Sequence, residues 1–118
     1  MKQESAILKI NELTALDIAV SSDEGDKINA RIETLLESYQ RIVLDFSGIK
    51  LLTSAFLNAA IGQLYGKYSN EEIASRISLV NVAPDDLPLF KKVIDRAKEY
   101  FKDKKNFSET TDNTFHGN

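Results

Sequence analysis

The chain has 118 residues, of which 42% are hydrophobic, a formal net charge of −3 at pH 7 and no cysteine. One domain of this size can bury enough surface to fold, and the lack of cysteine excludes disulfides, thiol catalysis and thiolate metal sites. The negative charge gives no long-range attraction to nucleic acid or anionic lipid. The sequence also contains no secretory leader pattern and no membrane-spanning apolar run, so we expect a cytoplasmic protein that binds neither nucleic acid nor membrane.

The first third of the sequence predicts a strand, a segment of ambiguous pattern and a helix. Residues 5–12, SAILKINE, have the short apolar alternation of a first strand. Residues 13–20, LTALDIAV, fit either a second strand or a turn of helix. From Asp26 to Tyr39, apolar residues recur at helical spacing with charged residues on the opposite side, which predicts an amphipathic helix lying on a sheet.

The middle of the sequence predicts a buried strand followed by a capped helix. Residues 41–46 contain a continuous apolar run, Ile42-Val43-Leu44, which is typical of a strand covered on both faces. A mostly apolar helix then begins at Thr53 or Ser54, since either side chain can accept a hydrogen bond from a backbone N–H of the first turn.

The last third predicts one more strand and one more helix. Glu71-Glu72 indicate a short polar connection. Residues 77–83, ISLVNVA, predict another buried strand, and Pro84 followed by two aspartates opens the last helix. The core-facing stripe of that helix is expected to extend to Tyr100 and Phe101.

Strands that alternate with helices favour an α/β domain, with a small sheet, parallel inner strands and helices packed mainly on one face. We place this domain at residues 5–102. Residues 103–118 are polar and aperiodic, so a mobile tail is expected there. In such sheets, ligands and partners usually bind at the carboxyl ends of the strands and the adjacent helix N-termini. This edge is predicted to contain Asp45, Ser47, Gly48, Thr53, Ser54, Asn81 and Pro84.

Motifs for catalysis or metal binding lack essential residues. His116 is the only histidine and falls in the predicted tail, so neither a Ser-His-Asp triad nor a histidine metal site is expected. The segment Gly62-x-x-x-Gly66-Lys67 is one residue shorter than a phosphate-binding loop and has Tyr68 where Ser or Thr would bind magnesium. We therefore expect no enzyme and no cofactor.

Three polar residues at and after the end of the middle strand each have two interpretations. Asp45 either fixes the Ser47-Gly48 turn by accepting backbone N–H bonds or contacts a partner. Thr53 and Ser54 are either helix caps or hydroxyls at a site where a phosphate group would be held by free N–H groups and the helix dipole.

The order of a strand, LDFSGI, a short hydrophobic step, TSAFL and an amphipathic helix resembles the STAS superfamily, the fold of anti-sigma factor antagonists and of sulfate-transporter tails. It is more similar to the bacterial STAS-like family of unknown function, whose members typically contain Asp-Phe-x-Gly-Val and then Thr-Ser-Ser-Phe. The resemblance covers roughly residues 5–102. The matching positions are Asp45, Phe46, Gly48, Ile49, Thr53, Ser54 and Phe56.

The antagonist branch implies where a phosphorylated residue would stand. There, Asp-Ser-Ser-Gly-Leu begins the corresponding helix and a partner kinase phosphorylates its second serine. On this chain the pattern covers residues 53–57 and places Ala55 at the acceptor position. Because alanine has no hydroxyl, the phosphorylation switch is not expected, whereas partner binding by this loop and helix is retained.

The resemblance implies a non-enzymatic regulatory module of bacterial signalling that binds a regulatory protein, for example an ATP-binding kinase-like protein. Phe56 or Leu57 is either an apolar anchor or, as is more common for such residues, part of the core, and the oligomeric state stays open. The alternative is a STAS domain that senses a small molecule or nucleotide at the same helix start. The expected partner-binding residues are Asp45, Ser47, Gly48, Thr53, Ser54 and Asn58.

Overall fold

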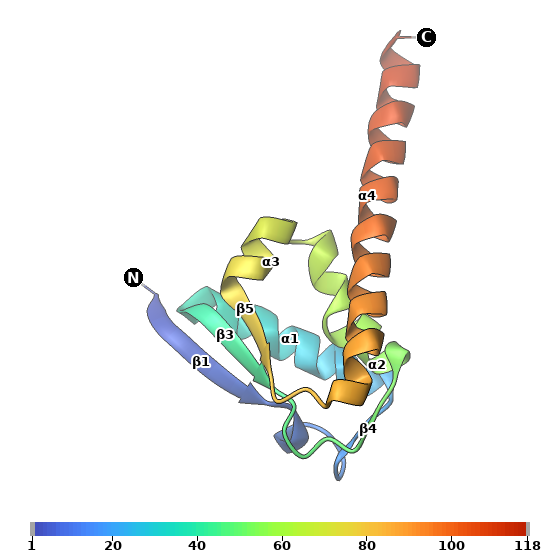
Figure 1. Ribbon diagram of the computed structural model, residues 1–118. Coiled ribbons are helices and arrows are strands. Elements are labelled where there is room, and N and C mark those ends of the chain that lie inside the picture. Colours follow the sequence, from blue (N-terminus) through green and yellow to red (C-terminus); the bar gives the residue numbers. More distant parts are fainter. Residues whose placement is uncertain (1, 118) are drawn as a thin grey trace.

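The computed structural model describes the backbone of residues 2–117 and the side chains of residues 2–102. Strands and helices alternate along the chain (Figure 1), which confirms the predicted α/β class. The elements are β1 (Gln3–Lys9), η1 (Ile10–Glu12), β2 (Ile18–Ala19), α1 (Ser22–Ser38), β3 (Tyr39–Asp45), β4 (Leu51–Leu52), α2 (Ser54–Ala60), η2 (Gly62–Gly66), α3 (Asn70–Arg76), β5 (Ile77–Val80), η3 (Pro84–Asp86) and α4 (Leu87–Gly117), where η marks a 3-10 helix.

The main sheet has the order β1-β3-β5, and both of its strand pairs are parallel. Parallel neighbours need a crossover connection. Between β1 and β3 the crossover contains α1, and between β3 and β5 it contains α2 and α3. A second pair, β2 with β4, has two residues in each strand and is also parallel.

The two faces of the main sheet differ in burial. In register across the three strands, Leu8, Leu44 and Leu79 face the core together with the helices. The next row faces away from the helices, and its Ile7 is 69% exposed. The helices thus lie on one face of the sheet, as predicted (Figure 1). The prediction that the middle strand is covered on both faces was wrong, because Val43 lies on the open face.

The helix α1 begins four residues earlier than the sequence pattern indicated. The hydroxyl of Ser21 accepts a hydrogen bond from the backbone N–H of Glu24 at 3.1 Å, so Ser21 caps the helix. Residues 22–25 contribute no apolar side chain, which is why periodicity alone missed this first turn. Gly25 lies against α2, since a Cβ at this position would be 2.5 Å from the backbone oxygen of Phe56.

Other boundaries also differ from the predictions. The first strand ends at Lys9, and Ile10–Glu12 turn as a 3-10 helix. The ambiguous segment 13–20 contains a turn and only a two-residue strand. The predicted buried strand at 77–83 is shorter, ends at Val80 and lies at the edge of the sheet, with two of its side chains exposed.

A helix takes the place of the predicted polar connection after Ser69. The Ser69 hydroxyl accepts from the backbone N–H of Glu72 at 3.0 Å and caps α3. This arrangement has the Ser-x-x-Glu pattern of a helix start. In α4, Tyr100 is exposed rather than part of the core-facing stripe.

The buried guanidinium of Arg76 joins three elements. It donates hydrogen bonds to the backbone oxygens of Leu36 at 2.7 Å, Tyr39 at 2.9 Å and Gln40 at 2.9 Å. A fourth bond, at 3.3 Å, reaches the Glu72 carboxylate. Arg76 therefore ties α3 to the end of α1 and the start of β3, and it satisfies carbonyl groups that the helix end leaves without a partner.

The helix α4 contains the residues for which a mobile tail was predicted. Its described side chains end at Lys102, and the predicted tail at 103–118, with His116, lies outside the described side chains. The tail therefore stays a prediction. Among the described residues, no helix combines the length and the apolar content that crossing a membrane requires.

Candidate functional site

The carboxyl end of the sheet brings Asp45, Ser47 and Asn81 together. One carboxylate oxygen of Asp45 accepts a hydrogen bond from the Asn81 side-chain amide at 2.9 Å and another from the Ser47 backbone N–H at 2.9 Å. The Asn81 bond, followed by the Ser47 bonds, holds the pKa of Asp45 below its ordinary value. Asp45 is therefore ionised near neutral pH and fixes the turn that follows β3.

The loop after this turn is fastened to a turn far away in the sequence. Gly48 has a φ of 78°, a left-handed conformation that glycine adopts without steric cost. The backbone N–H of Lys50 donates to the oxygen of Asp17 at 2.8 Å. Leu51 then pairs with Ile18 in the short β2–β4 sheet. The loop is thus positioned by residues 17–19.

Thr53 is a structural cap of α2. Its hydroxyl donates to the Val20 oxygen at 2.6 Å and accepts from the Phe56 N–H at 3.2 Å, while its own N–H donates to the Ala19 oxygen at 3.2 Å. Phe56 and Leu57 are fully buried. Of the two interpretations of these residues, anchor and core, the structure supports the core for both.

The exposed part of the predicted site is small. Gly48, Ser54 and Asn58 are exposed, whereas Asp45, Ser47 and Thr53 are partly buried. Ala55, which the resemblance to the antagonist branch aligns with a phosphorylated serine, is also exposed. Ser54, Ala55 and Asn58 are therefore accessible side chains on α2, and the buried residues Phe56 and Leu57 hold this helix against the core.

Sequence reasoning missed a turn beside this surface. Leu16 has a φ of 57° and is 81% exposed, and Leu51, which pairs with Ile18 shortly after Leu16 in the chain, is 54% exposed. No local signal marks Leu16, because leucine is rare in the left-handed conformation.

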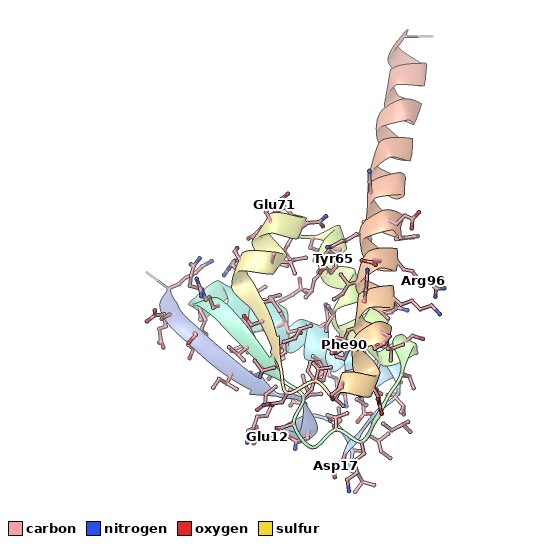
Figure 2. The ribbon with its side chains drawn as sticks, viewed as in Figure 1. Glu12, Asp17, Tyr65, Glu71, Phe90 and Arg96 are labelled. Atoms are coloured by element: carbon pink, nitrogen blue, oxygen red, sulfur yellow. The ribbon has the colours of Figure 1, made fainter. Side chains whose placement is uncertain are left out.

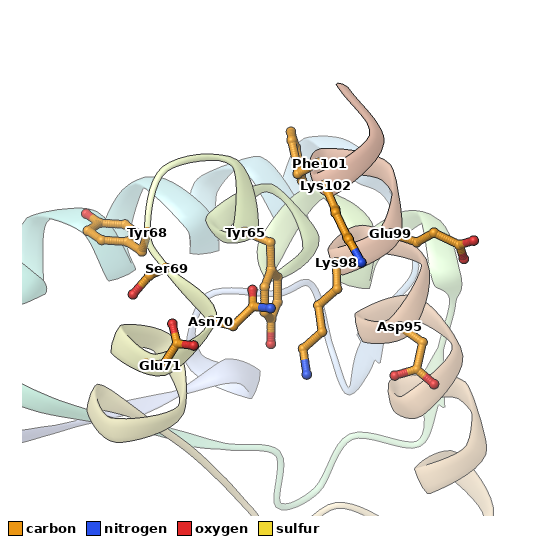
Figure 3. A pocket seen from close by; sticks show the side chains of 10 residues that line it. All are labelled: Tyr65, Tyr68, Ser69, Asn70, Glu71, Asp95, Lys98, Glu99, Phe101 and Lys102. Atoms are coloured by element: carbon orange, nitrogen blue, oxygen red, sulfur yellow. The ribbon is translucent and has the colours of Figure 1, made fainter. Parts of the chain in front are cut away.

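A separate hollow of about 670 Å³ lies between the segment from η2 to α3 and the helix α4 (Figure 3). The ammonium nitrogen of Lys98 is 5.9 Å from the centre of the Tyr65 ring, a cation–π arrangement. Burial, with a smaller effect of Asp95, raises the pKa of the Tyr65 hydroxyl. The lining contains no residue of the predicted site. Its residues are Tyr65, Tyr68, Ser69, Asn70, Glu71, Asp95, Lys98, Glu99, Phe101 and Lys102.

Metal binding has no donor set in the described part of the chain. Within it, no group of three or more histidine, aspartate or glutamate side chains is arranged to hold an ion. At the carboxyl end of the sheet, Asp45 has its hydrogen bonds from Asn81 and Ser47 instead.

Comparison with known proteins gives one match. The profile of a family described as a STAS-like domain of unknown function matches residues 24–87. The matched range runs from the first turn of α1 to the start of α4 and includes the loop and helix start described above. No curated protein and no solved structure gives a significant match.

Proposed function

The chain belongs to the family of STAS-like domains of unknown function, and on this basis we propose that it is a non-enzymatic regulatory module that binds a partner protein through residues 47–58. The family fixes the type of domain. The role and the surface are inferred from the geometry of the carboxyl end of the sheet.

The observation that carries this proposal is the exposed start of α2 on a rigid support. Thr53 joins α2 to the end of β2 through two hydrogen bonds and caps α2 through a third, and Phe56 and Leu57 fill the core below it. Ser54, Ala55 and Asn58 are accessible above it. Side chains whose positions are fixed in the free protein bind at a lower entropic cost than mobile ones.

Catalysis is a poorer explanation of the same residues. A general acid or base works best when its pKa lies near the operating pH, whereas hydrogen bonds lower the pKa of Asp45. The hydroxyl of Thr53 both donates and accepts within the fold, so its bonds would have to break before it could act as a nucleophile.

The proposed partner is a regulatory protein, for example an ATP-binding kinase-like protein of a bacterial signalling system in the cytoplasm. Ala55 offers no hydroxyl for phosphorylation, so the partner binds constitutively or under the control of its own nucleotide state. The neighbouring Ser54 does not replace it, since one step along a helix turns a side chain by about 100°.

A matched pair of substitutions tests the surface. Ala55→Arg places a large charged side chain on the exposed start of α2, and Ala74→Arg places the same side chain on the exposed face of α3. Proteins that co-purify with the tagged chain from its native host are quantified by mass spectrometry. We expect a specific protein to be lost with Ala55→Arg and kept with Ala74→Arg. Equal recovery with both variants would contradict the proposal.

A second candidate, small-molecule or nucleotide sensing, is favoured by the hollow beside Tyr65 rather than by the helix start at which the sequence placed it. Its volume of about 670 Å³ is within the range of ligand pockets. A ligand that binds only the folded protein raises the melting temperature with its concentration. A concentration-dependent rise with a metabolite that Tyr65→Ala abolishes would favour sensing.

A further inference from the structure

Leu16 presents an apolar side chain at the tip of a turn in an unfavourable backbone conformation. An exposed leucine alone needs no explanation, because every protein surface carries some. The left-handed conformation of Leu16, however, costs free energy that glycine would avoid and asparagine would largely avoid. The side chain does not recover this cost by burial, since it is 81% exposed.

The turn that carries Leu16 is firmly held. On one side of it, the Ala15 backbone N–H donates to the Glu24 carboxylate at 2.7 Å. On the other side, the Asp17 oxygen accepts from the Lys50 N–H at 2.8 Å. The hydroxyl of Thr14 donates to the oxygen of Ile10 at 3.3 Å. Because its supports come from α1 and from the loop after β3, the position of Leu16 is fixed before any partner arrives.

Leu16 is continuous with the surface proposed for partner binding. Ile18 pairs with Leu51, and Leu51 belongs to the segment 47–58. Leu51 is itself 54% exposed. Leu51 thus precedes the start of α2 in the chain, and Leu16 precedes the strand β2 that pairs with Leu51, whereas Phe56 and Leu57 of α2 itself are buried.

The surroundings of these leucines are acidic. Residues 10–24 and 46–52, which build the turn and its supports, contain four carboxylates and one ammonium group. Figure 2 shows Glu12 and Asp17 near the turn, at the end of the molecule where the loop after β3 lies. The one ammonium group, on Lys50, is 3.9 Å from the Asp17 carboxylate. The acidic residues are Glu12, Asp17, Asp23 and Glu24.

We propose that Leu16, together with Leu51, is the apolar anchor of the docking surface and inserts into an apolar pocket of a partner protein whose rim carries lysine and arginine side chains. This inference rests on the proposed function, for which it names the anchor and the chemistry of the partner. Insertion of the Leu16 side chain into a pocket gives a reason for its unfavourable left-handed backbone conformation. A basic rim complements the negative charge around the turn.

Photo-crosslinking in the native host tests the anchor and the proposed function separately. A benzophenone amino acid is placed at position 16, at position 58 on the proposed surface, or at position 7. The control position, Ile7, is an exposed apolar residue on the open face of the sheet. We expect positions 16 and 58 to crosslink to the same protein, through a segment rich in lysine and arginine, and position 7 not to do so.

The other outcomes are distinct. An adduct from position 58 without one from position 16 leaves the proposed function standing and overturns the anchor. Absence of adducts from all three positions overturns both. An adduct between two copies of this chain, or with a partner segment without basic residues, overturns the proposed partner chemistry.

A titration of the purified partner then measures the contribution of the anchor. Leu16→Asn suits the left-handed turn and removes the apolar side chain, so the melting temperature should stay equal or rise while the affinity falls at least about tenfold. Ile7→Thr should change the affinity less than about twofold. A Leu16→Asn protein that binds as tightly as the unaltered chain would overturn the inference.

Discussion

At both ends of the main sheet, side chains form hydrogen bonds with backbone groups, but these bonds have different structural effects at the two ends. At the amino end of β3, Arg76 donates to three backbone oxygens and is itself only 9% exposed. At the carboxyl end, Asp45, Thr53 and Glu24 also bond to backbone groups, and exposed residues such as Leu16, Gly48 and Ser54 lie next to these bonds in the chain. At the first end the bonds support the core, and at the second they support a surface.

This difference predicts separable effects of mutation. Loss of a bond at the Arg76 end leaves buried carbonyl groups without partners and lowers the free energy of unfolding. Substitution of an exposed side chain at the carboxyl end alters the surface proposed to bind a partner and leaves most internal bonds in place. Stability should therefore respond most at the Arg76 end, and partner affinity most at the carboxyl end.

The largest effect on stability is expected for Arg76→Ala. The substitution removes the donors to the oxygens of Leu36, Tyr39 and Gln40, and we expect it to lower the free energy of unfolding by about 3 kcal/mol. Urea denaturation measures this. Arg76→Lys keeps the charge and part of the hydrogen bonding and should cost less. A midpoint unchanged in Arg76→Ala would contradict the structural role assigned to this end.

Gly25→Ala should have the next largest effect, and it should lower both the stability and the affinity for a partner. Its Cβ would lie 2.5 Å from the Phe56 oxygen and 2.7 Å from the Ala59 Cβ, so α1 and α2 must separate. A cost of about 1 to 3 kcal/mol is expected, with weaker partner binding because α2 moves. The control is Gly66→Ala, whose Cβ would meet the side-chain ring of Phe101 rather than backbone. If Gly25→Ala and Gly66→Ala lowered the melting temperature equally, close packing of α1 on α2 would be contradicted.

A smaller, pH-dependent effect is expected at Asp45. Because its pKa is below the ordinary value, the carboxylate stabilises the fold above about pH 4, and this contribution is lost as the pH falls through the lowered pKa. Asp45→Asn can still accept hydrogen bonds but does not titrate. Urea midpoints of the two proteins should differ at neutral pH and converge in acid. Parallel curves at all pH values would show that Asp45 does not contribute through its charge.

The smallest expected change is in covalent modification. Phosphorylation of Thr53 would disrupt its bonds to Val20 and Phe56, and Ala55 has no acceptor oxygen, so protein from the native host should carry no phosphate at residues 53–55. Intact-mass and peptide analysis checks this. Stoichiometric phosphate on Ser54 or Thr53 would contradict it, whereas a gain of phosphate by Ala55→Ser from a cognate kinase would support the placement of Ala55.

The fold was predictable where local chemistry decided it. A cap at Thr53 or Ser54 and a strand at residues 41–46 follow from hydroxyl capping and from a run of apolar residues, and the structure has the cap at Thr53 and the strand at Tyr39–Asp45. Two Ser-x-x-Glu helix starts, at Ser21 and Ser69, carried a readable capping signal that periodicity alone overlooked. The two-residue strands β2 and β4 are too short to produce any period.

Other features depend on residues distant in the sequence. Arg76 binds carbonyl groups 36 to 40 residues away, and nothing near it in the sequence marks it as buried. The burial of Phe56 and Leu57 follows from the packing of α1 on α2, which Gly25 permits. Leu16 was missed for a related reason, because a left-handed leucine is held by contacts with α1 and with the loop after β3.

The proposal that the start of α2 binds a protein partner is tested most directly by titrating that partner, once purified, against the unaltered chain and Ala55→Arg. Melting curves of both proteins are recorded alongside. The account predicts that Ala55→Arg lowers the affinity more than about tenfold, which corresponds to about 1.4 kcal/mol, while the melting temperature changes by less than about 4 °C. Equal affinity of the two proteins would contradict the account.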